Sequence, residues 1–160
     1  MSAAHAVPHD APDPAPARGL KRKPQSVTLQ VSGGRPLRLR GELLAEGNSW
    51  APGTEAWHEI ALYRHDQEEV AVALRTFRKA EGSTDIHRAE LFPNLEEAMA
   101  WLIAFDPTAD LQVDLDCADR TLSTAMITLR AATLRQRADD ITRQYQSLLG
   151  EMLLHLDQGA

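Results

Sequence analysis

The chain has 160 residues, of which 17 are Lys or Arg and 23 are Asp or Glu, giving a formal net charge of −6. This length suits one modest domain with appendages, and no apolar run reaches the ~18–20 residues that a membrane helix needs. The single cysteine, Cys117, excludes an internal disulfide and a zinc site built from cysteines. We therefore expect a protein without a membrane span.

Residues 1–26 differ in composition from the rest of the chain. Five of the nine prolines lie here, interleaved with Ala and Asp. Such a segment buries too little apolar surface to offset the entropy of ordering it, which predicts a disordered tail. It ends in a basic cluster that is typical of a solubilising linker, or else of a contact with nucleic acid or an acidic partner. The tail lacks the apolar block of an export signal, so we expect a cytoplasmic location.

Residues 27–106 show the period-two alternation of half-buried strands. Runs at 27–31, 37–43, 57–64, 69–79 and 86–92 are separated by turn-forming or polar residues, which predicts an antiparallel meander of four to five strands. The stretch 70–74 is almost continuously apolar, as expected for a central strand. The last run is weaker and is expected at the edge of the sheet.

A helix is predicted directly after the last strand. Asn94 is a good N-cap and Glu97 stands three residues further on, where its carboxylate can return a hydrogen bond. Apolar residues recur at helical spacing until Asp106, which precedes a proline and so ends the helix. The fold class expected is α+β, with a sheet of four to five strands covered by one helix.

Residues 107–118 are expected to form an acidic connector or a short strand, and residues 119–157 a long amphipathic helix capped by Asp119. The helix contains no proline and one glycine, Gly150. Its apolar side chains recur at spacings of three and four, with a shift near residue 134. The preceding module is too small to cover this length, so we expect a coiled-coil or bundle homodimer, the alternative being a helix broken near Ala138 and folded back. The candidate oligomerisation residues are Leu122, Met126, Leu129, Ile141, Tyr145, Leu148 and Met152.

No complete set of catalytic residues is present in the sequence. The histidines lack helical zinc-site spacing, and His58 and Glu59, as neighbours on a strand, point to opposite faces. Asp114 and Asp116 share a strand face and are a weak candidate for a metal pair, but no phosphate-binding loop accompanies them. We therefore expect no enzymatic activity and no cofactor.

The remaining functional signal is on the predicted sheet. If the leucines of the 37–43 strand face the helix, alternation sends a mixture of basic and aromatic side chains outward, which is typical of surfaces that bind single-stranded nucleic acid. This candidate face contains Arg38, Arg40, Trp57, Tyr63, Arg75, Phe77 and Lys79. The order of strands followed by a helix also resembles one repeat of the Whirly and Pur-alpha single-stranded DNA-binding proteins, in topology only and over about half of the chain. The resemblance implies nucleic-acid binding by the sheet.

Net negative charge across both segments that we expect to fold opposes phosphate binding. The function that we expect is therefore that of a non-enzymatic adaptor or regulatory protein, which contacts a protein partner and forms a homo-oligomer. Single-stranded nucleic-acid binding is the alternative.

Overall fold

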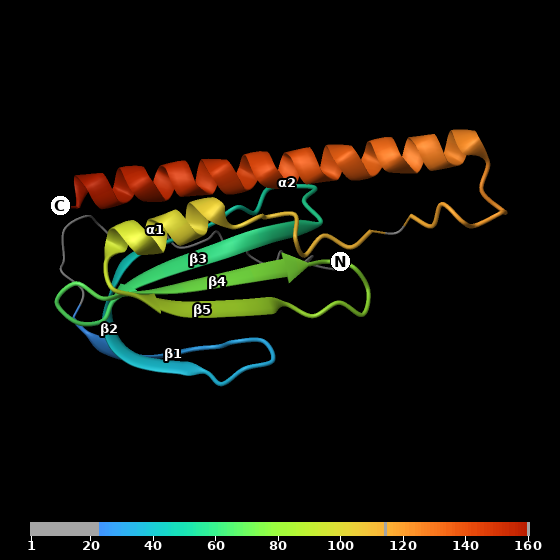
Figure 1. Ribbon diagram of the computed structural model, residues 1–160. Coiled ribbons are helices and arrows are strands. Elements are labelled where there is room, and N and C mark those ends of the chain that lie inside the picture. The colour runs from blue at the N-terminus through green and yellow to red at the C-terminus, as the bar shows by residue number, and fades with distance from the viewer. Residues whose placement is uncertain (1–22, 114, 160) are drawn as a thin grey trace, which may run out of the picture.

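Five strands pair in the order in which they follow along the chain, and two helices lie on one face of the resulting antiparallel sheet (Figure 1). The computed structural model describes residues 23–113 and 115–159. The elements are β1 (Gln25–Leu29), β2 (Leu37–Asn48), β3 (Ala56–Arg64), β4 (Val70–Arg78), β5 (Ile86–Phe92), α1 (Leu95–Ala104) and α2 (Thr124–Gln158). The α+β class, the meander and the helix that follows it are confirmed. Residues 1–22 of the predicted tail lie outside the described residues.

The main core lies between the sheet and the two helices. Helix α1 contacts β4 and β5, and α2 contacts β2 and β3. Alternate side chains of β3 and β4 are fully buried here, among them Ile60, Leu62 and Leu74. Burial of each such side chain contributes roughly 1.5–3 kcal/mol to folding. The hydroxyl of Tyr145 on α2 donates to the carbonyl of Leu102 on α1 at 2.7 Å and joins the two helices.

A second, smaller core lies on the other face of the sheet, where the β1–β2 hairpin folds under β4 and β5 (Figure 1). Leu39 packs there against Ala71, with Leu37 beside it. The expectation that these leucines face the helices is therefore wrong. The reason is a β-bulge between Leu43 and Ala45, where β2 gains one residue relative to β3. Odd-numbered residues point to the hairpin core before the bulge and to the helices after it.

The curvature of the sheet brings the turn after β1 to the far strand. The backbone N–H of Ser32 donates to the carbonyl of His87 at 2.8 Å, and the N–H of His87 donates to the hydroxyl of Ser32 at 2.9 Å. Strand β5 ends the strand order, as predicted for the last run, and β4 is an interior strand buried on both faces, with Ala71 and Val72 fully covered. The sheet is thus curved so that its first turn meets its last strand.

Helix α1 begins as the sequence predicts. The side chain of Asn94 accepts a hydrogen bond from the N–H of Glu97 at 2.9 Å, and its amide reaches the carboxylate of Glu97 at 3.5 Å. The helix ends at Ala104, with Phe105 in an extended conformation before Asp106. The two acidic residues in its first turn, Glu96 and Glu97, suit the positive end of the helix dipole.

Helix α2 begins at Thr124, five residues later than predicted, and runs unbroken to Gln158. Its cap is Ser123, whose hydroxyl accepts from the N–H of Met126. Asp119 instead caps a tight turn, accepting from the N–H and the hydroxyl of Thr121 at 2.8 and 2.6 Å. The prediction that Asp119 caps the helix is therefore wrong, as is the alternative of a break near residue 138. The described residues of the 107–118 connector contain turns and no strand.

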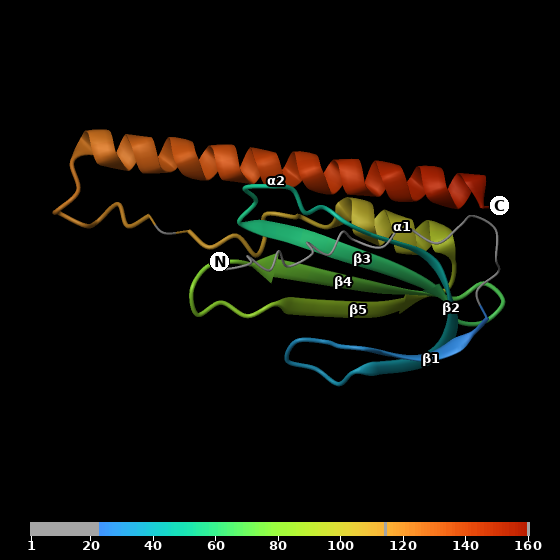
Figure 2. The same ribbon diagram turned by 180° about the vertical axis from the view of Figure 1, so that it is seen from behind.

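The first part of α2 extends beyond the end of the sheet, as both Figure 1 and Figure 2 show. At 1.5 Å per residue, the 35 residues of this helix span about 52 Å, longer than the strands beside it. The connector runs outward beneath this extended part to reach the start of the helix (Figure 1). In the described residues, no helix is both long and apolar enough to cross a membrane.

Candidate functional site

Five of the seven residues predicted for the nucleic-acid face do lie on one face of the sheet. Trp57 and Tyr63 on β3 alternate with buried residues, and Trp57 pairs directly with Phe77 on β4. Arg75 lies two residues before Phe77, and Lys79 follows the end of β4, so both continue the same alternation. Tyr63 packs against the hairpin core, which leaves the other four at the open end of this face.

These four side chains form a ladder of contacts in the order Lys79, Trp57, Phe77 and Arg75, with a cation at each end. The rings of Trp57 and Phe77 stack with centroids 4.9 Å apart and an angle of 5° between their planes. The guanidinium carbon of Arg75 lies 4.1 Å from the centroid of Phe77, and the ammonium nitrogen of Lys79 lies 5.7 Å from that of Trp57. Arg75 also pairs with Asp85 at 2.6 Å. The ring faces on which bases would stack are therefore already in contact with partners from the same chain.

Arg38 and Arg40 do not belong to this face. They alternate along β2 with Leu37 and Leu39, which face the hairpin core, so the two arginines point to the opposite side of the strand and are exposed there. Their assignment to the face of Trp57 is therefore wrong. The cause is the β-bulge of β2, which lies after these residues and which the alternation of the sequence does not reveal.

A partly buried polar cluster that the sequence did not indicate lies on the helix-facing side, at the end of the sheet. Arg88 on β5 holds Asp110 of the connector through two hydrogen bonds of 2.7 Å, and the hydroxyl of Thr76 donates to the same carboxylate at 2.9 Å. Burial alone would raise the pKa of Asp110, but the hydrogen bonds from Arg88 and Thr76 outweigh it and lower the pKa. This cluster fixes the connector to β4 and β5.

His58 lies beside this cluster with no solvent exposure. Its ring makes edge contacts with Phe105 and Tyr145, at centroid distances of 5.7 and 5.2 Å, and neither ring nitrogen has a hydrogen-bond partner in the described part of the chain. Burial lowers the pKa of His58 to about 4, with Asp110 opposing this shift and Arg88 reinforcing it. The imidazole is therefore neutral at pH 7 and serves as part of the core. Glu59 is exposed on the other face, as the alternation predicted.

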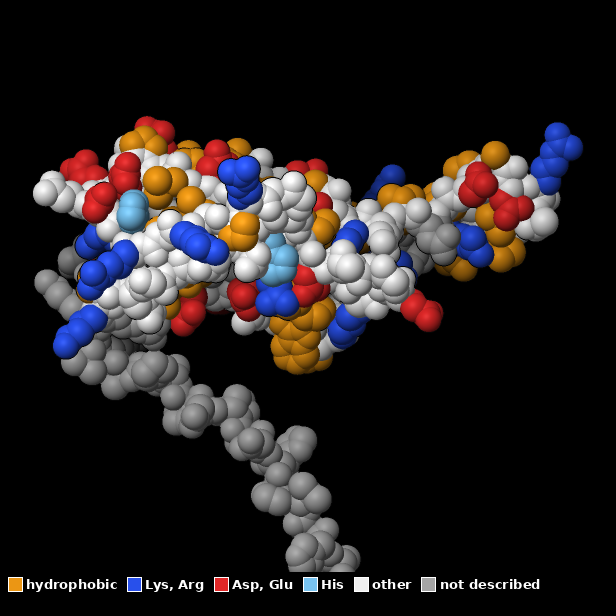
Figure 3. Space-filling model, turned by 90° about the horizontal axis from the view of Figure 1, so that it is seen from below, with side chains coloured by type: hydrophobic (Ala, Val, Ile, Leu, Met, Phe, Trp, Pro, Cys, Tyr) orange, Lys and Arg blue, Asp and Glu red, His pale blue; other side chains and the backbone are white. Residues whose placement is uncertain are grey.

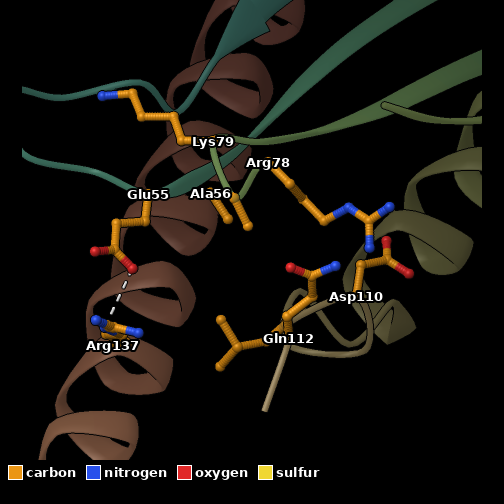
Figure 4. A pocket seen from close by; sticks show the side chains of 9 residues that line it. Glu55, Ala56, Arg78, Lys79, Asp110, Gln112 and Arg137 are labelled. Atoms are coloured by element: carbon orange, nitrogen blue, oxygen red, sulfur yellow. Dashed lines mark ion pairs between the residues drawn. The ribbon is translucent and has the colours of Figure 1, made fainter. Parts of the chain in front are cut away.

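A groove of about 540 Å³ opens beside the cluster, between the connector, α2 and the ends of β3 and β4 (Figure 4). Its charged side chains have partners within the chain: Arg137 pairs with Glu55 at 3.2 Å, and Arg78 donates to the carbonyl of Thr84 at 2.8 Å. Among the described residues that line the groove, none is a cysteine, serine or histidine that could act as a nucleophile or general base.

The predicted metal pair is not supported by the residue that can be placed. Asp114 lies outside the described residues, and the carboxylate of Asp116 accepts from the N–H of Ala118 at 2.8 Å in a tight turn. Elsewhere, His65, Asp66 and Glu69 bring one ligand atom each within 4.8 Å of one another. These residues form the turn between β3 and β4, which places acidic groups together for reasons of backbone geometry.

The seven candidate oligomerisation residues of the last helix divide into two groups. Ile141, Tyr145, Leu148 and Met152 are buried within the same chain, and the last three belong to the main core. Their assignment to an interface with another chain is therefore wrong: the sheet occupies this side of α2. Of the other three, Met126 and Leu129 lie in the projecting end of α2. Leu122 lies in the bend before the helix, so its predicted place on the helix is wrong.

Exposed apolar residues lie at both ends of α2. In the projecting end, Met126 is 46% exposed and Leu129 is 69% exposed. Near the other end, Leu153 and Leu154 are 44% and 59% exposed. Leu129 and Leu154 lie on the side opposite Tyr145, whereas Met126 and Leu153 lie on the two flanks. Figure 3 shows the projecting end standing away from the body of the molecule, with hydrophobic side chains among charged ones on its surface.

The fold and these surfaces define an α+β protein with a curved five-stranded meander and a projecting helix. Comparison with protein families, with curated protein sequences and with solved structures finds no significant match.

Proposed function

We propose that this chain is a non-enzymatic adaptor or regulatory protein of the cytoplasm, which acts through protein–protein contacts and forms a homo-oligomer through α2. The observation that carries the proposal is the pair of leucines on the outer side of α2, Leu129 and Leu154, which are both more than half exposed. Removing an exposed leucine of this kind from water is worth roughly 1.5–3 kcal/mol when its burial is complete. A second helix packed along this side provides that burial.

The projecting part of α2 gives a second reason for a partner. Residues 124–138 have no strand beneath them over much of their length (Figure 1), and an isolated helix shorter than ~12–15 residues is marginal in water. Helical stability in proteins comes mainly from packing of an apolar side. A partner along the projecting part supplies packing that the sheet cannot reach.

The polar groups of the chain support a non-enzymatic role. Asp110 and Arg88 are engaged with one another in the clamp that holds the connector, and His58 is enclosed without access to solvent. Residues with a perturbed pKa at catalytic sites normally line an accessible cleft, where substrate can reach them. Asp110 does line the groove, but its carboxylate is held by Arg88 and Thr76, so it secures the junction between the sheet and the connector.

Light scattering on the purified full chain tests the proposal. We expect a dimer or higher oligomer at micromolar concentration, and Leu129→Glu should shift it to the monomer because each interface would then bury an unpaired charge. Ile103→Glu is the matched control, since Ile103 is 61% exposed on α1 and is not part of the proposed interface. A wild-type chain that stays monomeric at high micromolar concentration, with its helices intact by circular dichroism, contradicts the proposal.

The alternative function, single-stranded nucleic-acid binding, is favoured by one observation: Trp57, Arg75, Phe77 and Lys79 do lie together on an open part of the sheet. Against it, the ring faces are engaged in the ladder, and Arg75 is paired with Asp85. An oligonucleotide titration at several salt concentrations tests it. Binding that falls steeply with salt, and that weakens with Phe77→Ala, would support the alternative.

A further inference from the structure

We propose that two copies of the chain pair α2 with α2 in antiparallel orientation, so that the projecting half of each helix lies along the outer side of the other's C-terminal half. This inference rests on the proposed self-association and adds its geometry. The occupant of the outer side of α2 is thus a second copy of this chain, related by a two-fold axis near the middle of the helix. Charge, side-chain position and the location of one glycine each support this arrangement.

The charges of α2 are divided between its two halves. Residues 124–138 contain three arginines and no acidic residue, whereas residues 139–158 contain four acidic residues and one arginine. A parallel pair of helices would place like charges beside like along the whole contact, which is destabilising. An antiparallel pair places the basic half of each copy beside the acidic half of the other. Complementary charge of this kind selects both the partner and its orientation.

The exposed leucines occupy matching positions on the helix. With 3.6 residues per turn, Leu129 and Leu154 point in directions within about 20° of one another. Both lie roughly 160–180° around the helix from Tyr145, which faces the sheet and is 2% exposed. They are about 37 Å apart along the axis. In an antiparallel dimer, Leu129 of each copy lies against Leu154 of the other, so the two-fold axis buries both leucine pairs. A parallel partner in the same register would place each leucine against its own counterpart.

The middle of the helix is self-complementary in this register. When Leu129 lies level with Leu154 of the second copy, Asp140 lies level with Arg143 of the second copy, since both pairs of residue numbers have the same midpoint. Within one chain these two side chains already face one another, with the guanidinium nitrogen of Arg143 3.4 Å from the carboxylate of Asp140. Their outward position puts two copies of this pair next to one another at the axis, where each cation can meet either anion.

Gly150 supplies the third observation. It lies inside α2, where glycine is less favourable than alanine by about 0.5–1 kcal/mol. Nothing in the described chain explains it, because a Cβ built at this position meets no atom within 4 Å. Gly150 lies one turn before Leu154 on the same outer side, and Ala132 lies one turn after Leu129. Small residues at these two positions allow the backbones of two helices to approach closely around the leucines.

Disulfide cross-linking of the full chain tests the orientation. In a Cys117→Ser background, which removes the native thiol, the variants Leu129→Cys and Leu154→Cys are oxidised separately and as an equimolar mixture. A disulfide requires Cα atoms about 4.4–6.8 Å apart. The antiparallel pair predicts a cross-linked dimer in the mixture alone, since each cysteine is then about 37 Å from its own copy. Cross-linking of either single variant with itself would overturn the proposal.

The failure of this inference can be told from the failure of the proposed function. Light scattering is run on each unoxidised cysteine variant. A dimer whose single variants cross-link with themselves, or whose mixture gives no cross-link, refutes the antiparallel geometry and leaves self-association standing. A monomer refutes both. Where a cysteine variant loses its helical circular dichroism, the charge test below replaces it.

The charge test uses residues whose substitution leaves the core untouched. Asp140→Arg is expected to weaken the dimer by at least about tenfold, because it places cations level with one another across the axis. The double variant Asp140→Arg, Arg143→Asp should restore the wild-type dissociation constant within a few-fold, and the effect of the single substitution should shrink at high salt. An unchanged dissociation constant for Asp140→Arg would refute the geometry.

Discussion

Replacing His58 by Leu gives the sharpest test of how the core is built. The imidazole lies under α2 with no exposure to solvent, and both of its nitrogens lack partners in the described part of the chain. Leu is similar in size and removes the two polar atoms. At about pH 7 we expect the free energy of unfolding to rise by roughly 1–3 kcal/mol, because a buried unpaired polar group destabilises the fold by about that amount.

The same substitution should change how stability depends on pH. Burial lowers the pKa of His58 from 6.5 to about 4, so between these values the unfolded chain binds a proton that the folded chain does not. Stability therefore falls as the pH drops through this window, and the loss is complete below pH 4. For these two pKa values the loss is only about 0.2 kcal/mol at pH 7 and about 2 kcal/mol at pH 5.

Urea denaturation followed by circular dichroism, at pH 7 and pH 5, measures both effects. The wild type should lose about 2 kcal/mol more than His58→Leu over this interval. Asp110 and Arg88 face His58 and remain in both proteins, so their contribution largely cancels in the comparison. His155→Gln, which removes an exposed histidine of α2, controls for loss of an imidazole as such. Equal pH dependence in wild type and His58→Leu would refute the assignment of His58 to a dry core.

The remaining predictions concern packing and the buried ion pair. Gly47→Ala should destabilise the fold by about 1 kcal/mol or more, because the added methyl would lie 2.8 Å from a side-chain carbon of α2. In the Leu129→Glu background, where the proposed contact between two copies of α2 is absent, Gly150→Ala should leave the free energy of unfolding unchanged or raise it by up to about 1 kcal/mol, since the methyl meets nothing within 4 Å; urea denaturation that ranks the two variants in the opposite order in that background contradicts this packing. Asp110→Asn should cost about 3 kcal/mol by leaving Arg88 without its anion, and Arg88→Met in addition should recover part of that loss in the same assay.

Much of the fold follows from the sequence because its signals are local. The alternation of apolar and polar residues along β3 and β4 has a period of two, so it identifies the strands and their buried sides without knowledge of their partners. The cap at Asn94 depends on side chains only three residues apart and was predicted correctly. The start of α2 was not, because Asp119 and Ser123 are both good caps and only the surrounding turn distinguishes them.

Features that depend on contacts between distant segments could not be predicted. The bulge in β2 leaves no mark on the alternation of Leu37 and Leu39, and its effect on Arg38 and Arg40 appears only in the register with β3. The ion pair between Asp110 and Arg88 joins the connector to β5. A continuous apolar pattern along α2 likewise does not say which part meets the sheet and which part remains exposed.

The bulge between Leu43 and Ala45 also makes one position of β2 dispensable for the pairing of the strand. Leu43 lies opposite Tyr63 and Ala45 opposite Leu62, so Leu44 is the extra residue. Deleting Leu44 alone would restore a regular ladder and leave Leu39 in the hairpin core. A deletion elsewhere in β2 would instead turn at least part of the strand to the other face of the sheet. Divergent copies of this chain should therefore vary in length at the bulge and at the turn 32–36, and keep the rest of β2 constant in length.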